Sequence, residues 1–381
     1  MKTVRVLQCG ALTDTYGGIE AYIYNQWKCI DKDKITYEFL VSRFDDCVAY
    51  EKELQSAGVK IHHDWVGRTN GIFSHYKALY NFFKNHEYDA VVCNVLRLSN
   101  IDCLLFAFFF HIPIRIVHSH QAFDGVKHGC KYKLMEKLHL HLLPIFCTHL
   151  LGCSNEAGRW MFGGLWNKYF GNRAFVIKNG IDSKRFAYSE TIRNDKRTVL
   201  GVNGKIVFGH TGRLSLQKNQ LFVLDVFYEI HKYCNNSHLL LVGDGVLRKK
   251  IEDKIKKMEL EDNVTLLGER LDIPEILQAM DVFLFPSEWE GLGISLIEAQ
   301  ASGLRCFVSD VIPQEAIVTD NVIKLPLSKG SFVWAKTIMQ SMNYERVDRS
   351  ADVRTAGFDS VESCRGIEKI FINAKSKADG L

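Results

Sequence analysis

The sequence predicts an α/β protein with parallel sheets in two domains. Short apolar runs, each typical of a buried strand, alternate along the chain with longer amphipathic stretches typical of helices. This alternation indicates parallel sheets that carry helices on both faces. A length of 381 residues suits two domains better than one. Glycine-rich segments also follow several of the apolar runs, which is where such sheets bind ligands.

The first half of the chain carries most of this alternation. Its strand patterns are separated by amphipathic stretches, so we expect the strands to be parallel and any ligand to bind beyond their carboxyl ends. The helices are expected at residues 19–29, 51–56, 73–85, 100–110 and 127–143. The strands are expected at residues 4–9, 37–41, 59–62, 88–95, 114–119, 149–154 and 174–178.

The second half repeats the pattern. It follows residues 183–203, which are polar, lack clear periodicity and therefore indicate a linker. The expected strands are residues 205–210, 238–242, 264–267, 282–285 and 306–309. One helix is expected to begin near Gln220. The other expected helices span residues 247–258, 272–280, 295–301 and 361–374.

Composition excludes several classes of protein. Hydrophobic residues make up 47% of the chain and charged residues 24%, as in a soluble globular protein. The formal net charge of +4 is too small to indicate a nucleic-acid partner. The longest apolar run, residues 103–110, is too short to cross a bilayer, and the chain enters a strand pattern at Thr3 without a signal peptide. We therefore expect a cytoplasmic protein, soluble or peripheral to the inner face of the cell membrane.

The cysteines and histidines predict no metal centre. The chain has 11 cysteines without a C-x-x-C pair, and most lie among apolar residues, as Cys9, Cys93 and Cys103 do. An odd count without close spacing favours reduced, buried thiols. The histidine pairs at 62–63 and 139–141 do not have the spacing of a zinc site.

A glycine-rich loop organises the second half of the chain. The apolar strand at 282–285 runs into a segment with Gly291 and Gly293, which permit a tight turn before the helix at 295–301. Free N–H groups and the positive end of the helix dipole make such a helix start an anion site. The N–H groups expected to bind the anion belong to Gly291, Leu292, Gly293, Ile294 and Ser295.

Two carboxylates lie beside this loop: Glu290 stands in it and Glu298 lies in the following helix. A carboxylate repels phosphate but accepts two hydrogen bonds from a vicinal diol, so hydroxyl groups are the expected partners. Phosphate on the N–H groups and diols on the carboxylates together describe a nucleotide sugar. The alternative is a pair of ordinary acids, one on a solvated loop and one on a helix surface.

A second loop carries two cations. Arg213 and Lys218 lie between the strand at 205–210 and the helix that begins near Gln220. Two cations at the start of a helix oppose its dipole, an arrangement that favours binding of an anion. The alternative for either residue alone is ordinary surface charge.

Two features of the first half also suit a ligand site. His118 and His120 lie on one face at the carboxyl end of the strand at 114–119. A histidine satisfied within the protein is the alternative, above all for His118. Gly17 and Gly18 precede a helix and suit a phosphate cradle, although most such pairs are only turns.

A helix that is both basic and apolar is expected to begin at Lys127 and end at Leu143. This pattern is typical of a helix on an anionic membrane surface, and the alternative is a core helix with a solvated basic face. Its lysines are Lys127, Lys131, Lys133 and Lys137, and its apolar residues include Leu134, Met135, Leu138 and Leu142.

Together these motifs resemble a known family. The paired-glutamate motif of the family 4 retaining glycosyltransferases is similar to the segment Glu290-Gly-Leu-Gly-Ile-Ser-Leu-Ile-Glu298-Ala-Gln-Ala-Ser-Gly303. The resemblance runs through nearly the whole chain, because several motifs agree in order and spacing. One departure follows Gly303: many members continue with a residue and then proline, whereas this chain has Leu304-Arg305-Cys306, with a charge at Arg305 where an apolar residue is usual.

The resemblance implies the GT-B fold, in which two Rossmann-like domains with parallel sheets face each other across a cleft. It implies an acceptor-side domain at residues 1–182, a linker at 183–203 and a nucleotide-sugar-binding domain at 204–356. A C-terminal helix at about 357–381 is expected to pack back on the first domain.

The resemblance also implies roles for particular residues. Arg213 and Lys218 correspond to cations on the donor diphosphate, and Glu298 and Glu290 are assigned to the ribose and the sugar hydroxyls. Four residues are implied in catalysis: His120, Glu290, Arg213 and Lys218.

The first domain and a further loop complete the implied donor site. Gly17 and Gly18 correspond to a glycine-rich loop that approaches the donor phosphates, and Gly268 to a loop near the nucleobase. His120, with His118 as second choice, corresponds to a histidine on the sugar hydroxyls. Cationic side chains take the place of a metal, and no cofactor is expected besides the nucleotide diphosphate sugar substrate.

The implied activity is retaining transfer of a hexose-type sugar from a nucleotide diphosphate sugar. The acceptor is a carbohydrate or a lipid-linked carbohydrate, as in the synthesis of capsular and exopolysaccharides. Two alternatives remain from the sequence: a nucleotide-sugar epimerase on the same fold, and a non-catalytic, two-lobed sugar-binding protein.

Overall fold

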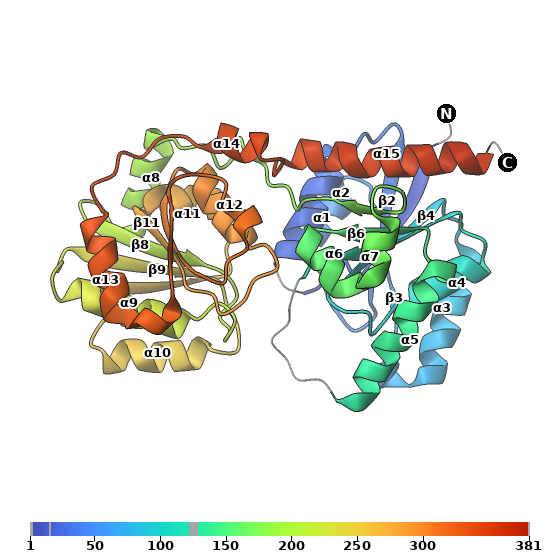
Figure 1. Ribbon diagram of the computed structural model, residues 1–381, viewed down its shortest axis with the longest axis horizontal. Helices are drawn as coiled ribbons and strands as arrows, with labels where there is room; N and C mark the ends of the chain where they lie inside the picture. The colour runs from blue at the N-terminus through green and yellow to red at the C-terminus, as the bar shows by residue number, and fades with distance from the viewer. Residues whose placement is uncertain (1–2, 15–16, 122–128, 380–381) are drawn as a thin grey trace. The chain divides into compact units, whose positions relative to one another are not determined.

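The computed structural model describes residues 3–14, 17–121 and 129–379, which form two compact units (Figure 1). Unit 1 comprises Met1–Gly180 and Ser360–Leu381, and unit 2 comprises Ile181–Asp359. Each unit has a parallel sheet of its own, so the α/β prediction with two parallel sheets is confirmed.

The sheet of unit 1 has seven strands among the described residues, all paired in parallel. They are β1 (Val4–Cys9), β2 (Ile35–Ser42), β3 (Ile61–Trp65), β4 (Ala90–Val95), β5 (Ile114–Ser119), β6 (His149–Gly152) and β7 (Ala174–Val176). Their order is β3-β2-β1-β4-β5-β6-β7. The order reverses beside β1, so the carboxyl ends of β1 and β4 flank a switch point where such sheets bind ligands.

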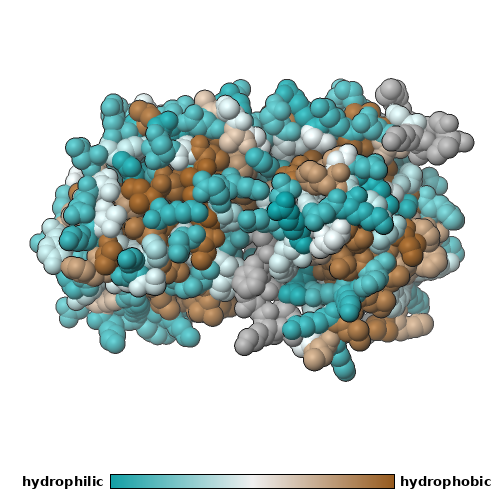
Figure 2. Space-filling view, viewed as in Figure 1, coloured by the Kyte–Doolittle hydropathy of each residue, from teal (hydrophilic) through white to brown (hydrophobic). Residues whose placement is uncertain are grey.

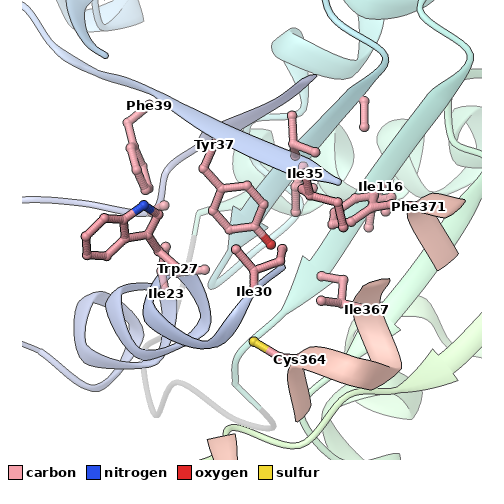
Figure 3. Packing of buried hydrophobic residues seen from close by; sticks show 14 of the residues in the cluster. Ile23, Trp27, Ile30, Ile35, Tyr37, Phe39, Ile116, Cys364, Ile367 and Phe371 are labelled. Carbon is pink, nitrogen blue, oxygen red and sulfur yellow. The ribbon is translucent and has the colours of Figure 1, made fainter. Parts of the chain in front are cut away.

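Helices cover both faces of this sheet. The described helices are α1 (Gly18–Cys29), α2 (Glu51–Ser56), α3 (Ile72–Asn85), α4 (Asp102–Phe109), α5 (Cys130–Phe146), α6 (Asn155–Phe162), α7 (Gly164–Tyr169), α15 (Ser360–Asp379) and the 3₁₀ turn η1 (Arg68–Asn70). The last helix of the chain, α15, packs against α1 in unit 1. Figure 3 shows Trp27 of α1 and Phe371 of α15 beside Tyr37 of β2, in one buried cluster.

The sheet of unit 2 has six strands among the described residues, again all parallel. They are β8 (Ile206–Thr211), β9 (Ser237–Val242), β10 (Val264–Gly268), β11 (Val282–Phe285), β12 (Arg305–Ser309) and β13 (Val322–Leu325). Their order is β10-β9-β8-β11-β12-β13, which reverses beside β8. Every residue of β9 and β11 is buried, as expected for central parallel strands with continuous apolar runs.

The helices of unit 2 include three that the sequence did not predict: α8, α13 and α14. The described helices are α8 (Glu190–Leu200), α9 (Gln220–His231), α10 (Arg248–Lys257), α11 (Ile273–Ala279), α12 (Ile294–Ala301), α13 (Gly330–Gln340) and α14 (Ser350–Thr355), with the 3₁₀ turns η2 (Gln314–Ala316) and η3 (Leu327–Lys329). Helix α8 lies inside the predicted linker at 183–203, so that prediction is wrong for this segment. The helix packs on α11 through hydrogen bonds from arginines. Its sequence therefore lacks the apolar stripe that would indicate a packed helix.

The 11 cysteines are all free, but burial is not uniform. Cys47 and Cys130 are exposed, whereas Cys9, Cys93 and Cys103 are buried as predicted. None of the described helices combines the length and apolar character needed to cross a membrane.

Candidate active site

Two loops at the switch point of unit 2 form the candidate site. One loop, residues 212–219, joins β8 to α9, and the other, residues 286–293, joins β11 to α12. Because β8 and β11 are parallel neighbours, both loops leave the same edge of the sheet. The N–H of Glu288 donates to the carbonyl of Gln217 at 2.8 Å, which ties the two loops together.

Two buried polar residues that the sequence analysis missed hold the first loop in place. The Gln220 amide donates to the carbonyl of Arg213 at 2.9 Å and accepts from the N–H of Ser215 at 3.2 Å. Its amide nitrogen also lies 3.1 Å from Nε2 of His210, whose Nδ1 lies 2.8 Å from the carbonyl of Leu284. Burial lowers the pKa of His210 to about 4, so the ring is neutral and can donate through Nδ1 and accept at Nε2. The available signal in the sequence was His210, a polar residue near the end of a buried strand.

The structure brings Lys218 and Glu290 together. Nζ of Lys218 lies 2.6 Å from Oε1 of Glu290, whose side chain is only 5% exposed. The same ammonium lies 4.9 Å from the centre of the Phe285 ring. At Gly212, where φ is +152°, a Cβ would come within 3.3 Å of Lys218 Cε, so glycine there leaves room for the lysine chain. The cation predicted to bind phosphate is therefore paired with the acid predicted to bind sugar hydroxyls.

Arg213 differs from Lys218 in having no such partner. Its side chain is exposed at the start of the loop. In the described part of the chain its guanidinium makes no hydrogen bond or ion pair. A guanidinium with free donors beside a glycine-rich loop is suited to a phosphate group.

The second loop presents the open start of α12. Gly293 precedes the helix with φ of +83°, and a Cβ there would approach the Phe285 ring at 3.1 Å, so both the turn and the packing require glycine. The N–H groups of residues 291–295 find no acceptor among the described residues. They are the free donors of a helix N-terminus, which suit an anion.

Glu298 lies one turn into α12 and is partly buried. Its carboxyl group has no hydrogen-bond partner in the described part of the chain. Burial raises its pKa to about 8, against the opposing charges of Lys218 and Arg185. The group is therefore largely protonated at neutral pH and can exchange hydrogen bonds with a ligand hydroxyl.

Gly268 is the last residue of β10 and has φ of +66°. Its carbonyl accepts from the N–H of Gly243 at 2.8 Å. It lies at the same carboxyl edge as the two loops but is separated from β8 by β9.

Unit 1 holds a buried polar cluster at the carboxyl end of its sheet. The rings of His118 and His120 lie 4.1 Å apart, which agrees with the predicted common face. His120 Nε2 lies 3.0 Å from Oδ1 of Asn94, and the Asn94 amide donates to Gln8 Oε1 at 2.9 Å. Burial lowers the pKa of His120 to about 3 and that of His118 well below its ordinary value, so both rings are neutral.

Several polar atoms of this cluster are buried without a partner among the described residues. They are Nδ1 of His120, Nε2 of His118 and Nε2 of Gln8. Buried polar groups are rarely left unpaired, so these atoms suit a ligand with hydroxyl groups. Asn94 and Gln8 gave no signal in the sequence beyond their position in buried strands.

The glycine pair lies at the start of α1 in unit 1. Gly17 is the N-cap residue, and no side chain caps the helix there. A Cβ at Gly18 would meet nothing within 4 Å, so packing does not require glycine at that position. The open helix start is compatible with a phosphate, but the structure gives no further support to the cradle.

The basic helix corresponds to α5, which begins at Cys130, and Lys127 lies outside the described residues. Leu134 is 70% exposed and Leu138 is 56% exposed, so these two leucines are not part of the core. His139 and Leu143 form the buried side of the helix.

One group of described residues places three potential metal ligands together. The Sγ atoms of Cys9, Cys93 and Cys103 all lie within 4.8 Å of one another in the core of unit 1. Within the described part of the chain, Glu290 and Glu298 belong to no such group.

Comparison with known proteins identifies the class to which this site belongs. Residues 192–343 match the family described as Glycosyl transferases group 1, a range that includes both loops of unit 2. These residues make up most of unit 2, and the similarity to proteins named as glycosyltransferases extends over the rest of the chain. The predicted glycosyltransferase is confirmed, and the comparisons give no support to the epimerase alternative.

Particular relatives share much of the chain. EpsF of Bacillus subtilis (strain 168), named only provisionally as a glycosyltransferase, is 29% identical over 362 residues, which are 93% of each chain. The UDP-Gal:alpha-D-GlcNAc-diphosphoundecaprenol alpha-1,3-galactosyltransferase of Escherichia coli is 32% identical over 260 residues, 63% of this chain and 62% of the relative.

Solved structures with little sequence identity share the fold. Anabaena Alr3699/HepE in complex with UDP has a TM-score of 0.74 at 20% identity, covering 98% of this chain and 100% of that one. WaaG, a glycosyltransferase involved in lipopolysaccharide biosynthesis, has a TM-score of 0.68 at 18% identity, covering 96% and 99%. The fold is GT-B, with two Rossmann-like units, as the resemblance implied.

Proposed function

We propose that this glycosyltransferase moves a hexose-type sugar, with retention of anomeric configuration and without a metal, from a uridine diphosphate sugar to a lipid-linked glycan. The process it serves is synthesis of a surface polysaccharide. The observation that carries the proposal is the Lys218–Glu290 pair, which lies beside the open N–H groups of residues 291–295 and the unpartnered Arg213.

The proposed sugar nucleotide rests on these cations and N–H groups and on the names of the relatives. Two cations and a free helix start suit a diphosphate, whose charge grows as the sugar leaves. The Escherichia coli relative is named for UDP-Gal, and Anabaena HepE is described in complex with UDP. These names favour uridine as the base.

The pairing of Lys218 with Glu290 suggests how the site responds to a donor. When the diphosphate enters, Lys218 exchanges the carboxylate for phosphate oxygens, and Glu290 becomes free to accept hydrogen bonds from sugar hydroxyls. Arg213 and the N–H groups of α12 take the remaining phosphate charge. Glu298, whose carboxyl group is unpartnered, accepts the ribose hydroxyls. Because the cations already balance the diphosphate, no metal is required.

In unit 1, the buried polar cluster offers neutral groups to the sugar. His120 has a fixed ring, held by Asn94, and an unpartnered Nδ1 that suits a hydroxyl donor. His118 offers a second unpartnered nitrogen. Both histidines orient the sugar in this proposal, and neither is required to transfer a proton.

Retention follows from attack on the same face as the departing diphosphate. Glu290 is paired with a lysine and is assigned to hydroxyl binding, so it is a poor candidate for a covalent nucleophile. The acceptor hydroxyl therefore forms its bond to the anomeric carbon as the bond from that carbon to the phosphate oxygen breaks. The departing phosphate oxygen takes the proton of the acceptor hydroxyl.

The acceptor proposal rests on the surface of unit 1. Large apolar side chains are exposed on three neighbouring helices, and Figure 2 shows hydrophobic residues on the part of the unit that carries them. One of these helices, α5, also exposes Lys131, Lys133 and Lys137. An apolar surface with lysines suits an anionic membrane that presents a lipid-linked acceptor. The apolar residues are Ile72, Phe73 and Tyr80 of α3, Phe109 of α4, and Tyr132, Leu134, Leu138 and Ile145 of α5.

A donor screen followed by product analysis tests the proposal. Thermal-shift measurements against a panel of nucleotide sugars should show the largest stabilisation with a uridine diphosphate hexose. Transfer from that donor to a lipid-linked saccharide should give a product whose new bond keeps the anomeric configuration of the donor, as read by NMR coupling constants. A product with inverted configuration would rule out the same-face mechanism.

A further inference from the structure

A second concave site lies in unit 2, at the opposite edge of the sheet from the two loops. A hollow of about 450 Å³ opens at the amino ends of β8, β11 and β12, where the first residue of each strand lines it: Ile206, Val282 and Arg305. A strand of six residues such as β8 spans roughly 17 Å, so the hollow is separate from the loops at the carboxyl ends. Its volume is within the range of small-molecule sites.

This hollow, here called the basic pocket, is strongly positive. Five cationic side chains and one carboxylate line it: Arg193, Arg197, Lys205, Arg305 and Arg346, with Asp281. An excess of cations in a concave site produces a focused positive potential. Such a potential favours a multiply charged anion.

Three of the arginines also have a structural role. Arg193, Arg197 and Arg346 donate to backbone carbonyls at the end of α11, where the helix dipole is negative. Arg193 and Arg346 share two acceptors, the carbonyl of Gln278, each at 2.9 Å, and the carbonyl of Met280, each at 2.7 Å. Burial, followed by the charge of Arg193, lowers the pKa of Arg346 to about 10. Arg193 and Arg197 both pair with Asp281, so one carboxylate faces all five cations of the pocket.

Arg305 has no such structural role. Its Nε is buried without a hydrogen-bond partner among the described residues, and its guanidinium carbon lies 4.6 Å from the centre of the Tyr344 ring. The Tyr344 hydroxyl is held in turn by Asn321, whose amide donates to it at 2.6 Å. Arg305 is thus a positioned cation with unused donors, at the place where the sequence carries a charge in place of the usual apolar residue.

We propose that the basic pocket binds a phosphoryl group carried by a small molecule, at a site separate from the donor loops. Arg305 donates to the phosphoryl oxygens, since a planar guanidinium matches their geometry. Lys205, Arg193 and Arg346 supply the surrounding positive charge, and the rings of Tyr188 and Tyr344 line the space for the rest of the molecule.

Calorimetric titration with pyrophosphate tests this proposal. Because pyrophosphate also suits the donor loops, the titration uses a background variant, Arg213→Ala with Lys218→Ala. This variant should still bind one pyrophosphate per chain. Adding Arg305→Leu should weaken that binding by about tenfold or more, the effect expected for charged hydrogen bonds. Arg305→Lys keeps the charge but lacks the planar N–H donors of the guanidinium, so it should give an intermediate loss of pyrophosphate affinity. This variant decides the question if Arg305→Leu does not fold.

Two controls make the result specific. Arg354→Leu removes an exposed arginine of α14 that does not line the pocket and should leave pyrophosphate affinity unchanged. Co-sedimentation of the wild-type chain and of Arg305→Leu with phosphatidic acid vesicles separates a soluble phosphate from a lipid headgroup, because only a headgroup ligand would make vesicle binding depend on Arg305. The proposal is overturned if the background variant binds no pyrophosphate, or if Arg305→Leu and Arg354→Leu bind it equally well.

Discussion

Nζ of Lys218 lies 2.6 Å from Oε1 of Glu290, an ion pair that joins two loops across 72 residues of sequence. Each partner belongs to a motif that suits a different part of a nucleotide sugar. In the protein without ligand, the pair neutralises the buried carboxylate of Glu290 and holds the ammonium of Lys218 beside the second loop. Entry of a diphosphate must break the pair, so the two residues should respond to mutation in opposite ways.

We therefore predict opposite effects on uridine diphosphate binding. Lys218→Ala removes a cation and should weaken the affinity for uridine diphosphate by about tenfold or more. Glu290→Gln releases Lys218 from its partner, so the affinity should be unchanged or higher, while sugar transfer falls by about a hundredfold because sugar hydroxyls lose a charged acceptor. Calorimetry and initial rates measure the two effects. Equal loss of nucleotide affinity in both variants would contradict this division of roles.

A second prediction concerns stability and pH. Burial raises the folded-state pKa of Glu298 from 4.5 to about 8, so the unfolded chain loses this proton at lower pH than the folded protein. The mismatch costs no stability below about pH 4.5, grows as pH rises and is complete above about pH 8. Glu298→Gln should therefore raise the free energy of unfolding at pH 8 by about 1 to 3 kcal/mol, a range reduced for the partial exposure of the group.

Urea unfolding at pH 8 and at pH 4.5 measures this difference. The wild-type chain and Glu298→Gln should have similar free energies of unfolding at pH 4.5 and should diverge toward pH 8. A variant that is less stable than wild type at pH 8 would show that Glu298 has a stabilising partner.

The same group should couple nucleotide binding to proton release. Ribose hydroxyls donate to the ionised form of Glu298, so uridine diphosphate should bind more tightly as pH rises toward 8. At pH 8, where the nucleotide is already fully ionised, binding should release about half a proton, because a group with pKa of about 8 is then half protonated. Calorimetry in buffers of different ionisation enthalpy measures this release, and Glu298→Gln should abolish it.

The sheets could be predicted from the sequence because their strands are continuous apolar runs. All six residues of β4 are buried, and its predicted and observed carboxyl ends coincide at Val95. The start of α12 was also predictable, since glycine before an apolar helix is a local signal. Helix α8 was not, because its attachment to α11 depends on Arg193 and Arg197 rather than on an apolar face. Its Ser189 N-cap and its Gly201 C-cap were the signals available.

The candidate site was predictable residue by residue but not as an arrangement. Glu290 and Lys218 were each identified, whereas their pairing depends on β8 and β11 being neighbours in the sheet. Gln220 was missed because a buried amide that supports a loop looks in sequence like any polar residue near a helix start. The charge at Arg305 was noticed as unusual, and only the fold shows that it lines a basic pocket.

We predict that sugar transfer persists in an excess of EDTA. Arg213, Lys218 and the N–H groups of residues 291–295 balance the diphosphate in the proposed mechanism, so a divalent cation has no charge left to neutralise. Initial rates with and without chelator should agree within about twofold, a difference of less than about 0.5 kcal/mol in activation free energy. Loss of activity that manganese or magnesium restores would contradict the metal-independent mechanism.

A further prediction concerns the lysines and leucines of α5. Replacing Lys131, Lys133 and Lys137 by glutamine should release the protein from anionic vesicles at low salt, since each lysine near such a surface contributes about 1 kcal/mol. Leu134→Ser should weaken binding at high salt as well, because its contribution is apolar. Co-sedimentation across a salt series measures both effects.

Helix α10 supplies the matched control for this experiment. It is also basic, but its apolar residues Ile251 and Ile255 are buried. Replacing its exposed Lys250, Lys256 and Lys257 by glutamine removes the same charge from the chain. These changes should leave vesicle binding intact. If both triple variants lose it equally, net charge rather than the surface of α5 explains the attraction.

The most direct test of the account compares uridine diphosphate with uridine in wild type, Arg213→Ala and the control Arg354→Leu. The central claim is that the loops after β8 and β11 bind the diphosphate. Calorimetry should show that Arg213→Ala lowers the affinity for uridine diphosphate by about tenfold or more and leaves that for uridine unchanged, with Arg354→Leu like wild type. Equal affinity of wild type and Arg213→Ala for uridine diphosphate would contradict the claim.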